Sequence, residues 1–444
     1  MSLTLPTASY HPLAQAANET LAKEAPVVVD LLSERGKRFY FPAKGILAQG
    51  AEAKQKATTA NATIGIATDA KGPMYLDVVH QSFAGLTARE LYDYAPSFGK
   101  PELRAAWAKK QREETPSLGT QTISNPVVTN ALTHGLSVIG DLFLNPGDDV
   151  LITDLHWENY DLGWAVRLGA TLHEIPLFDQ KLTGLNQEAF IQALGRFKGR
   201  KLVVALNFPN NPSGYTPTKA EAGAITNALI AAANVGTKLV VVCDDAYYGM
   251  FFDDQCETES LFGRLAGAHE NILAVKIDGA TKEEFVWGLR VGFVTYGLKG
   301  ATAAAYAALE QKTGGIIRST ISNVSMASQS VVLKALTAPA FRAQQAEKVA
   351  ILRQRYEVTK TEARKLEYAD AWDVYPFNSG YFMCVRTKGC TADAARQELL
   401  TTHGIGTIAL GHTELRIAFS CLEEHQIAGV FSAAAKAIRA VQVR

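Results

Sequence analysis

The chain has few cysteines, no net charge and no long apolar run. Its five cysteines form no CxxC pair and no recognisable metal spacing, which predicts reduced thiols. Lys plus Arg and Asp plus Glu both number 44, so no overall charge attracts nucleic acid or anionic lipid. No stretch approaches the roughly 20 apolar residues of a membrane span, and the N-terminal residues do not resemble a secretory signal. We therefore expect a cytoplasmic protein that binds small molecules, without nucleic-acid or membrane partners.

Two common nucleotide-binding loops are also missing. Neither GxGxxG nor GxxxxGK followed by Ser or Thr comes after an early apolar run, which disfavours a nicotinamide or phosphate-loop enzyme. The residues that precede the motif region contain no basic recognition helix, which disfavours a DNA-binding regulator.

Short apolar runs alternate with segments of helical spacing over some 200 residues. The run Leu239–Cys243 has no polar alternation, which predicts a strand buried on both faces inside a parallel sheet. Together the runs predict an open α/β sheet between helices. Expected strands lie at 150–154, 171–176, 202–207, 239–243, 272–277 and 292–296, and expected helices at 100–111, 133–144 and 219–234.

The character of the chain changes beyond about residue 325. A long charged helical stretch (340–367) precedes three further strand-like runs, at 372–376, 381–385 and 415–419. Before about residue 70 the pattern is irregular. We predict an N-terminal arm with part of a small domain (1–70), a large domain (71–325) and a smaller C-terminal α+β domain (326–444).

Polar side chains follow three of the expected strands, where ligands bind in an open α/β sheet. They are the amides of 207–211, the acid and phenol of Asp244 and Tyr247, and the cations Lys282 and Arg290. Pyridoxal phosphate requires such a set. It needs an amine for an imine, a carboxylate beside its ring nitrogen, donors to its phenolic oxygen and a cation for its phosphate.

Three motifs give the sequence a family resemblance. They are NNPSG (210–214), DDAY (244–247) and the span from Lys282 to Arg290 followed by Val291-Gly292. In this combination the chain resembles the class I/II aminotransferases of the fold-type I pyridoxal-phosphate enzymes, of the aspartate/aromatic kind. The resemblance runs from about residue 60 to 325 and resumes near 378. It implies a mostly parallel seven-stranded sheet between helices, and transfer of an amino group from an L-amino acid to a 2-oxo acid.

The resemblance also implies roles for single residues around the cofactor. Lys282 would hold pyridoxal phosphate as a Schiff base and later move a proton. Asp244 would pair with the pyridine nitrogen, and Tyr247 and Asn211 would donate to the phenolic oxygen. The remaining cofactor contacts would be the phosphate contacts Arg290, Leu132, Thr133 and Thr281, the stacking ring of Trp157, and Tyr94.

Other implied roles concern the substrate and a second subunit. Arg416 would bind the α-carboxylate of the substrate, and Ile66 and Ala67 would close over it. Tyr94 would reach the phosphate of a neighbouring subunit, which implies a homodimer. The sequence departs from the family at the phosphate turn, where Ala131 and Leu132 replace small Ser and Gly residues, and at Gly279, where a serine is common.

Substrate and reaction remain open at this stage. Arg318 resembles an arginine that contacts a distal carboxylate across the dimer, which favours aspartate or glutamate as donor and 2-oxoglutarate as acceptor. Aromatic or broad specificity is the alternative. A carbon–sulfur lyase, or another α,β-elimination enzyme of the same fold, would share these residues.

Each residue also has a purely structural interpretation. Asp244 could cap a helix, Lys282 could lie on the surface, and Arg290 could pair with Glu283 or Glu284. Asn211-Pro212 could be only a turn, and Trp157 could be ordinary core. His134 and His156 lack a carboxylate at ligand spacing, so no metal is expected.

Overall fold

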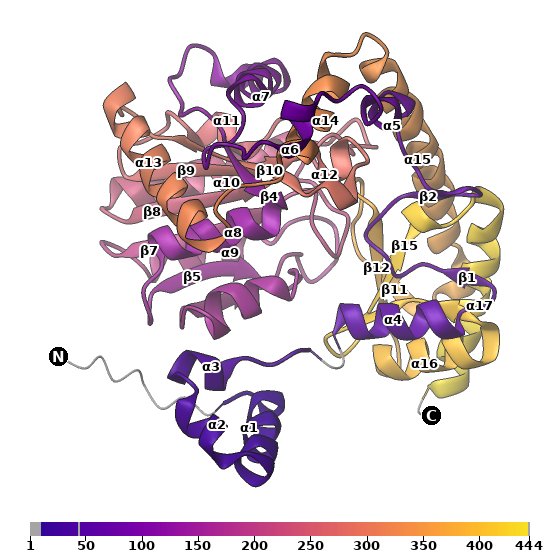
Figure 1. The fold of residues 1–444 in the computed structure, drawn as a ribbon. Helices are drawn as coiled ribbons and strands as arrows, with labels where there is room; N and C mark the ends of the chain where they lie inside the picture. The colour runs from indigo at the N-terminus through magenta and orange to yellow at the C-terminus, as the bar shows by residue number, and fades with distance from the viewer. Residues whose placement is uncertain (1–9, 43–44, 443–444) are drawn as a thin grey trace.

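The computed structural model describes residues 10–42 and 45–442 (Figure 1). Its centre is a seven-stranded sheet in the order β4-β10-β9-β8-β7-β5-β6. Every neighbouring pair is parallel except those made by β10, which runs antiparallel to both β4 and β9. This confirms the predicted mostly parallel seven-stranded sheet. The strands are β4 (Val127–Asn130), β5 (Asp149–Thr153), β6 (Thr171–Ile175), β7 (Lys201–Asn207), β8 (Lys238–Asp244), β9 (Ile272–Gly279) and β10 (Val291–Gly297).

Helices cover both faces of this sheet, as the apolar strands predict. Along β8, Leu239 and Val241 pack into one core together with side chains of α9, α10 and α11. The intervening Val240 and Val242 pack into a second core with α8 and with Tyr306 of α13. Side chains alternate between faces along a strand, so an uninterrupted apolar run supplies both cores.

Helices make up about half of the described chain outside this sheet. The predicted helix 219–234 coincides with α10, where Thr218 and Glu221 form a capping box at its N-terminus. The helices are α1 (Pro12–Glu24), α2 (Pro26–Leu31), α3 (Glu34–Arg38), α4 (Ile46–Lys56), α5 (Asp77–Ser82), α6 (Ala88–Tyr92), α7 (Pro101–Glu114), α8 (Ala131–Phe143), α9 (Gln187–Gly195), α10 (Lys219–Asn234), α11 (Leu261–Leu265), α12 (Ala280–Glu283), α13 (Ala303–Thr320), α14 (Met326–Thr337), α15 (Phe341–Ala363), α16 (Ala392–His403) and α17 (Glu424–Val441).

A second, four-stranded sheet follows in the C-terminal part. It has the order β11-β12-β15-β14, with antiparallel neighbours throughout, and its strands are β11 (Trp372–Val374), β12 (Phe382–Thr387), β14 (Ile408–Leu410) and β15 (Glu414–Ala418). Helices α15, α16 and α17 pack beside it (Figure 1). Strand β1 (Ala60–Asn61) pairs with β13 (Ile405–Gly406), so the early chain joins this region. The α+β character agrees with the prediction, and the boundaries near residues 70 and 325 stay predictions.

The described parts of the irregular sequence before residue 57 (10–42 and 45–56) nevertheless form four helices. Helices α1, α2 and α3 lie together at one side of the molecule (Figure 1). Ala14 is their one buried residue within the described chain. A helix that buries almost no side chain needs no apolar stripe, and such a stripe is the pattern that marks a core-facing helix in a sequence. Within residues 10–42 and 45–442, no helix combines the length and apolar character that crossing a membrane requires.

Candidate active site

A cavity of about 340 Å³ lies at the carboxyl ends of the central strands. Asn207 ends β7 and Asp244 ends β8, and Lys282 follows directly after β9. Eleven of the predicted site residues line this one cavity: Ile66, Leu132, Thr133, Trp157, Asn211, Asp244, Tyr247, Thr281, Lys282, Arg290 and Arg416. A larger neighbouring cavity of about 1000 Å³ contains none of them. We therefore take the smaller cavity as the site.

Asp244 lies at the end of β8, almost fully buried. One carboxylate oxygen accepts a hydrogen bond from the Tyr160 hydroxyl, and the other accepts from the backbone N–H of Ala246 (3.2 Å). The Asn207 side chain donates to the backbone carbonyl of Asp244 (3.0 Å). Burial raises the pKa of Asp244 to about 6, although the Tyr160 hydrogen bond and the charge of Lys282 lower it. Asp244 caps no helix in this structure, so that alternative is wrong.

Lys282 belongs to α12, a helix of four residues. Its ammonium lies 4.9 Å from the ring centre of Tyr247. Burial lowers the pKa of Lys282 to about 8, with a further lowering by Arg290 and an opposing effect of Asp244. A lysine with this pKa is partly deprotonated near neutral pH and can act as a nucleophile. The alternative of a surface lysine is wrong.

The N-terminus of α8 and Arg290 form a cationic corner of the cavity. Ala131 and Arg290 both have left-handed backbone conformations (φ 59° and 56°), and the N–H of Ala131 donates to the carbonyl of Arg290 (3.0 Å). A Cβ at Gly292 would lie 2.7 Å from the Ala131 backbone, so only glycine fits there. The free N–H groups of the first turn of α8 and the guanidinium suit an anion such as phosphate.

Arg290 has no carboxylate partner among the described residues. Its guanidinium donates to the carbonyl of Trp287 (3.3 Å), while Glu283 and Glu284 face Lys110 instead. The predicted alternative of a pair with either glutamate is therefore wrong.

Arg416 enters the cavity from β15 and is only 2% exposed. It donates to the Asn211 side-chain oxygen (3.1 Å) and to the carbonyl of Thr63 (2.8 Å), and lies 4.2 Å from the centre of the Phe382 ring. Its Nε and the Thr281 hydroxyl are buried without a hydrogen-bond partner in the described chain. Buried polar atoms are rarely left unsatisfied, so these two indicate that a polar ligand belongs here.

Some residues at the site had no role in the sequence prediction. Tyr160 donates to the carboxylate of Asp244 without lining the cavity itself, whereas Asn207, which donates to the carbonyl of Asp244, is one of the amides that the sequence singles out. Periodicity cannot show that side chains from distant segments meet. The lining residues without a predicted role are mostly apolar, namely Ile46, Leu47, Gly65, Ala131, Ala246, Trp287 and Phe382.

Three predicted residues do not line this cavity. Ala67 is fully buried in the core behind Ile66. Tyr94 is 90% exposed, and Arg318 is exposed at the end of α13, where it donates to the hydroxyl of Ser322. The Ser97 hydroxyl donates to the carbonyl of Ser322 (2.9 Å), so the segments that carry Tyr94 and Arg318 meet on one surface.

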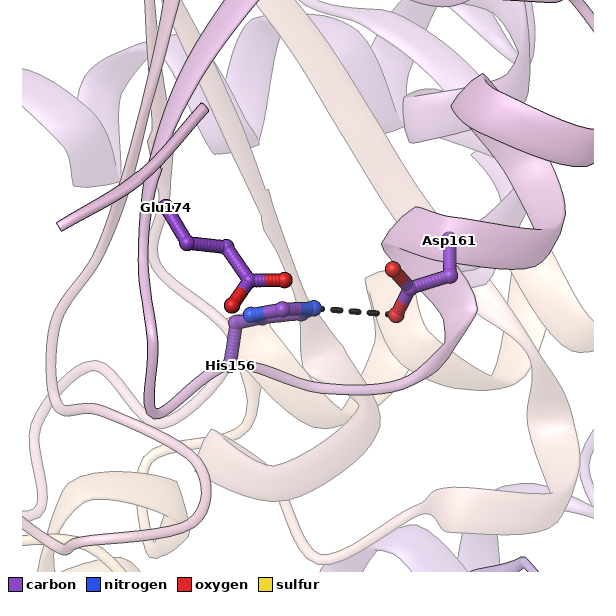
Figure 2. A group of neighbouring side chains, drawn as sticks. All are labelled: His156, Asp161 and Glu174. Atoms are coloured by element: carbon purple, nitrogen blue, oxygen red, sulfur yellow. Dashed lines mark hydrogen bonds and ion pairs between the residues drawn. The ribbon is translucent and has the colours of Figure 1, made fainter. Parts of the chain in front are cut away.

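His156, Asp161 and Glu174 lie together beside the loop that carries Trp157 (Figure 2). The imidazole contacts two acceptors, the carbonyl of Thr153 (2.8 Å) and the carboxylate of Asp161 (2.9 Å). Burial alone would lower the pKa of His156, but Asp161 more than offsets this and the pKa is raised. Both ring nitrogens are engaged, so the arrangement favours a protonated imidazole in an ion pair over a metal ligand.

Comparisons with known proteins agree with this geometry. Residues 63–433 match the family described as aminotransferase class I and II. The chain is 29% identical over 154 residues to an aspartate aminotransferase of Musicola paradisiaca, and 28% identical over 205 residues to an aspartate/prephenate aminotransferase of Thermus thermophilus. These stretches are 35% and 45% of this chain and 36% and 47% of the relatives, so the chain spans less than half of their length.

The fold extends further than these sequence matches. An aminotransferase structure from Anaerococcus prevotii superimposes with a TM-score of 0.80 at 20% identity, over 91% of this chain and 98% of the other. The family match covers most of the chain and includes every residue that lines the cavity except Ile46 and Leu47. The protein is therefore a member of the class I and II aminotransferase family.

Proposed function

We propose that the protein is a pyridoxal-phosphate aminotransferase that moves an amino group from an L-amino acid to a 2-oxo acid such as 2-oxoglutarate. One observation carries the proposal. Lys282 shares a cavity with Asp244 and with two guanidinium groups, Arg290 and Arg416, that have no carboxylate partner in the described residues. A cavity with three cations and one carboxylate suits anionic ligands, and family members use pyridoxal phosphate.

The lining residues fit this cofactor. Arg290 and the first turn of α8 would hold its phosphate, and Asp244 would pair with its ring nitrogen. The hydroxyl of Tyr247 and the amide of Asn211 would donate to its phenolic oxygen, and Trp157 would cover the ring. When bound, the cofactor withdraws electrons from the substrate α-carbon, so that the α-proton can leave.

Side chains of the protein would bind the substrate and transfer the protons. Arg416 would bind the α-carboxylate, because its Nε has no other partner and Asn211 holds the guanidinium in place. Lys282, with its pKa lowered to about 8, would take the proton from the α-carbon of the substrate and deliver it to the bound cofactor. An ionised Asp244 would keep the ring nitrogen protonated, with the hydroxyl of Tyr160 supporting the charge.

We propose aspartate as the amino donor, with aromatic amino acids as the alternative. The names of the two curated relatives support this choice. Within one subunit, the cavity residues that have no proposed role toward the cofactor are mostly apolar, which suits an aromatic substrate side chain. A distal carboxylate would need Arg318 from a second subunit. The shared surface of Tyr94 and Arg318 supports a homodimer in which both reach the neighbouring site.

The test combines trapping with turnover. Purified protein loaded with pyridoxal phosphate and treated with borohydride should carry the cofactor on the peptide that contains Lys282, and should transaminate with 2-oxoglutarate. Lys282→Ala should lose both the adduct and turnover, whereas Lys109→Ala, on the exposed side of α7, should keep both. A normal turnover rate in Lys282→Ala would refute the assignment. Pyruvate and ammonia released without an acceptor would favour the lyase.

A further inference from the structure

Two buried lysines lie behind the candidate active site. Asp244 and Lys282 are each followed in the chain by a carboxylate, Asp245 and Glu283. Lys276 on β9 forms an ion pair with Asp245, and Lys110 on α7 forms one with Glu283. All four of these pairing side chains are at most 5% exposed. Neither Asp245 nor Glu283 lines the cavity, so each ion pair holds the side of the backbone away from the site.

Lys110 is the centre of a crowded group of charges. Its ammonium lies 2.7 Å from Glu114 and 3.8 Å from Glu284, in addition to its contact with Glu283. Arg342 of α15 approaches Glu114 from outside (3.0 Å). The Lys110 ammonium also lies 4.7 Å from the ring centre of Trp107 and 6.0 Å from that of Tyr248. Three carboxylates thus share one buried ammonium and one guanidinium.

Other contacts hold this short segment as well: the Tyr381 hydroxyl donates to the carbonyl of Lys282 (3.3 Å), and the N–H of Phe285 donates to the same carbonyl (3.1 Å). Helix α12 spans only Ala280–Glu283 and has no side-chain cap. A helix of one turn is not stable by itself. Phe285, just beyond it, has a left-handed backbone (φ 56°), and Gln345 donates to the carbonyl of Glu283 (2.9 Å). Glu283 is the residue next to Lys282, so its ion pair with Lys110 is the side-chain contact of α12 that constrains the direction of Lys282.

We propose that Lys110 is a positioning residue for Lys282, acting through Glu283 to hold the single turn of α12 so that the Lys282 amine faces the cavity. This inference rests on the proposed function, in which Lys282 is the amine that binds pyridoxal phosphate. Replacing a buried ion pair by apolar residues often leaves stability unchanged, and in some proteins such pairs serve to specify one geometry. A displacement of about 1 Å in a reacting group can slow a reaction by up to about 100-fold.

The test uses the cofactor-free protein and the rate at which it captures pyridoxal phosphate. Samples are quenched with borohydride at intervals, and the modified Lys282 peptide is quantified across a range of pH. The wild-type rate should rise with pH as the Lys282 amine loses its proton. Lys110→Met and Glu283→Ala should both slow capture by at least about tenfold and move the midpoint of this pH dependence. Lys109→Met, with its exposed pair to Glu113, should stay within about twofold of the wild type.

Further variants separate positioning from stability. The double variant Lys110→Met/Glu283→Ala should be no slower than about twice either single variant, because one contact carries the effect. Glu283→Gln can still accept from Lys110 and should recover most of the rate. If Lys110→Met does not fold, Glu283→Ala decides the question.

One result would refute the positioning role of Lys110, and a different result would refute the proposed function. Folded variants that capture the cofactor at the wild-type rate and midpoint, with only a lower melting temperature, would leave Lys110 a purely structural role. Stable capture by Lys282→Ala would instead refute the proposed function.

Discussion

The Tyr160 hydroxyl donates a hydrogen bond to the carboxylate of Asp244, and both side chains are buried. Tyr160 lies in the loop after β5, whereas Asp244 ends β8, so 84 residues separate the partners. Burial raises the pKa of both groups, and in Asp244 this hydrogen bond opposes the rise. The bond therefore helps to keep the carboxylate ionised close to neutral pH.

Replacing Tyr160 by Phe should move the acidic limb of the pH profile of kcat/KM to higher pH. A hydrogen bond to a charged group contributes about 1.5–3 kcal/mol, which corresponds to a rise of about one to two pH units in the pKa of Asp244. At pH 7 we expect kcat/KM to fall by between about twofold and about tenfold, with recovery at higher pH.

Tyr215→Phe is the matched control for this variant. Tyr215 is also buried and donates to a carboxylate, that of Glu221 (2.8 Å), but neither residue lines the cavity. It should leave the acidic limb in place. An unchanged limb in Tyr160→Phe would show that the hydrogen bond does not support the charge of Asp244.

Arg318→Leu tests the choice of substrate. If Arg318 of a second subunit binds the distal carboxylate, kcat/KM for aspartate should fall by about 100-fold or more, because a charged hydrogen bond is lost in the transition state. The value for phenylalanine should change by less than about threefold. Equal losses for both substrates, measured with 2-oxoglutarate as acceptor, would remove Arg318 from substrate binding.

Gly214→Ala should destabilise the protein. Gly214 has φ +73°, and a Cβ there would lie 1.9 Å from the Phe382 carbonyl oxygen. The clash and the left-handed backbone together should cost about 2–4 kcal/mol in the free energy of unfolding, measured with denaturant. Gly300→Ala has a similar φ (+76°) and open space, so it should cost only about 1 kcal/mol. Equal costs would mean that the loop moves away from Phe382.

Asp161→Asn should reduce stability only at lower pH. The fold raises the pKa of His156 above its ordinary 6.5, so its ion pair stabilises the protein below that value. The contribution disappears as the pH rises through the folded pKa. Because Asp161 is 42% exposed, the loss should stay below about 1 kcal/mol. Asp141→Asn removes an ion pair with Arg167 that contains no histidine, so its effect should be constant between about pH 6 and 9. A constant effect of Asp161→Asn would contradict the raised pKa.

Strand ends were the most informative part of the sequence. The run Leu239–Cys243 is short, apolar and rich in valine, which is typical of a strand buried on both faces inside a covered sheet. The polar residues after such runs must then lie at one edge. This is why the sequence alone could assign Asp244 and Lys282 to one cavity.

The hydrogen-bond partners of those residues could not be assigned in the same way. Tyr160 resembles any aromatic residue after a strand until the fold brings it to Asp244. From the sequence, Arg290 could pair with Glu283 as well as with an anionic ligand. The structure shows that Glu283 instead forms an ion pair with Lys110 of α7. Such partners come from segments that are distant in the chain, and the pattern of neighbouring residues does not show which distant segments meet in the folded protein.

By itself, the sequence determined the α/β class, six of the seven strands of the central sheet (β4 was not predicted) and which polar side chains follow those strands, because the apolar pattern of a strand lies in adjacent residues. The tertiary structure alone decided what each charge faces, and therefore the pKa values of Asp244 and Lys282. Electrostatic free energy depends on separation in space and on burial, and both are set only when the chain has folded.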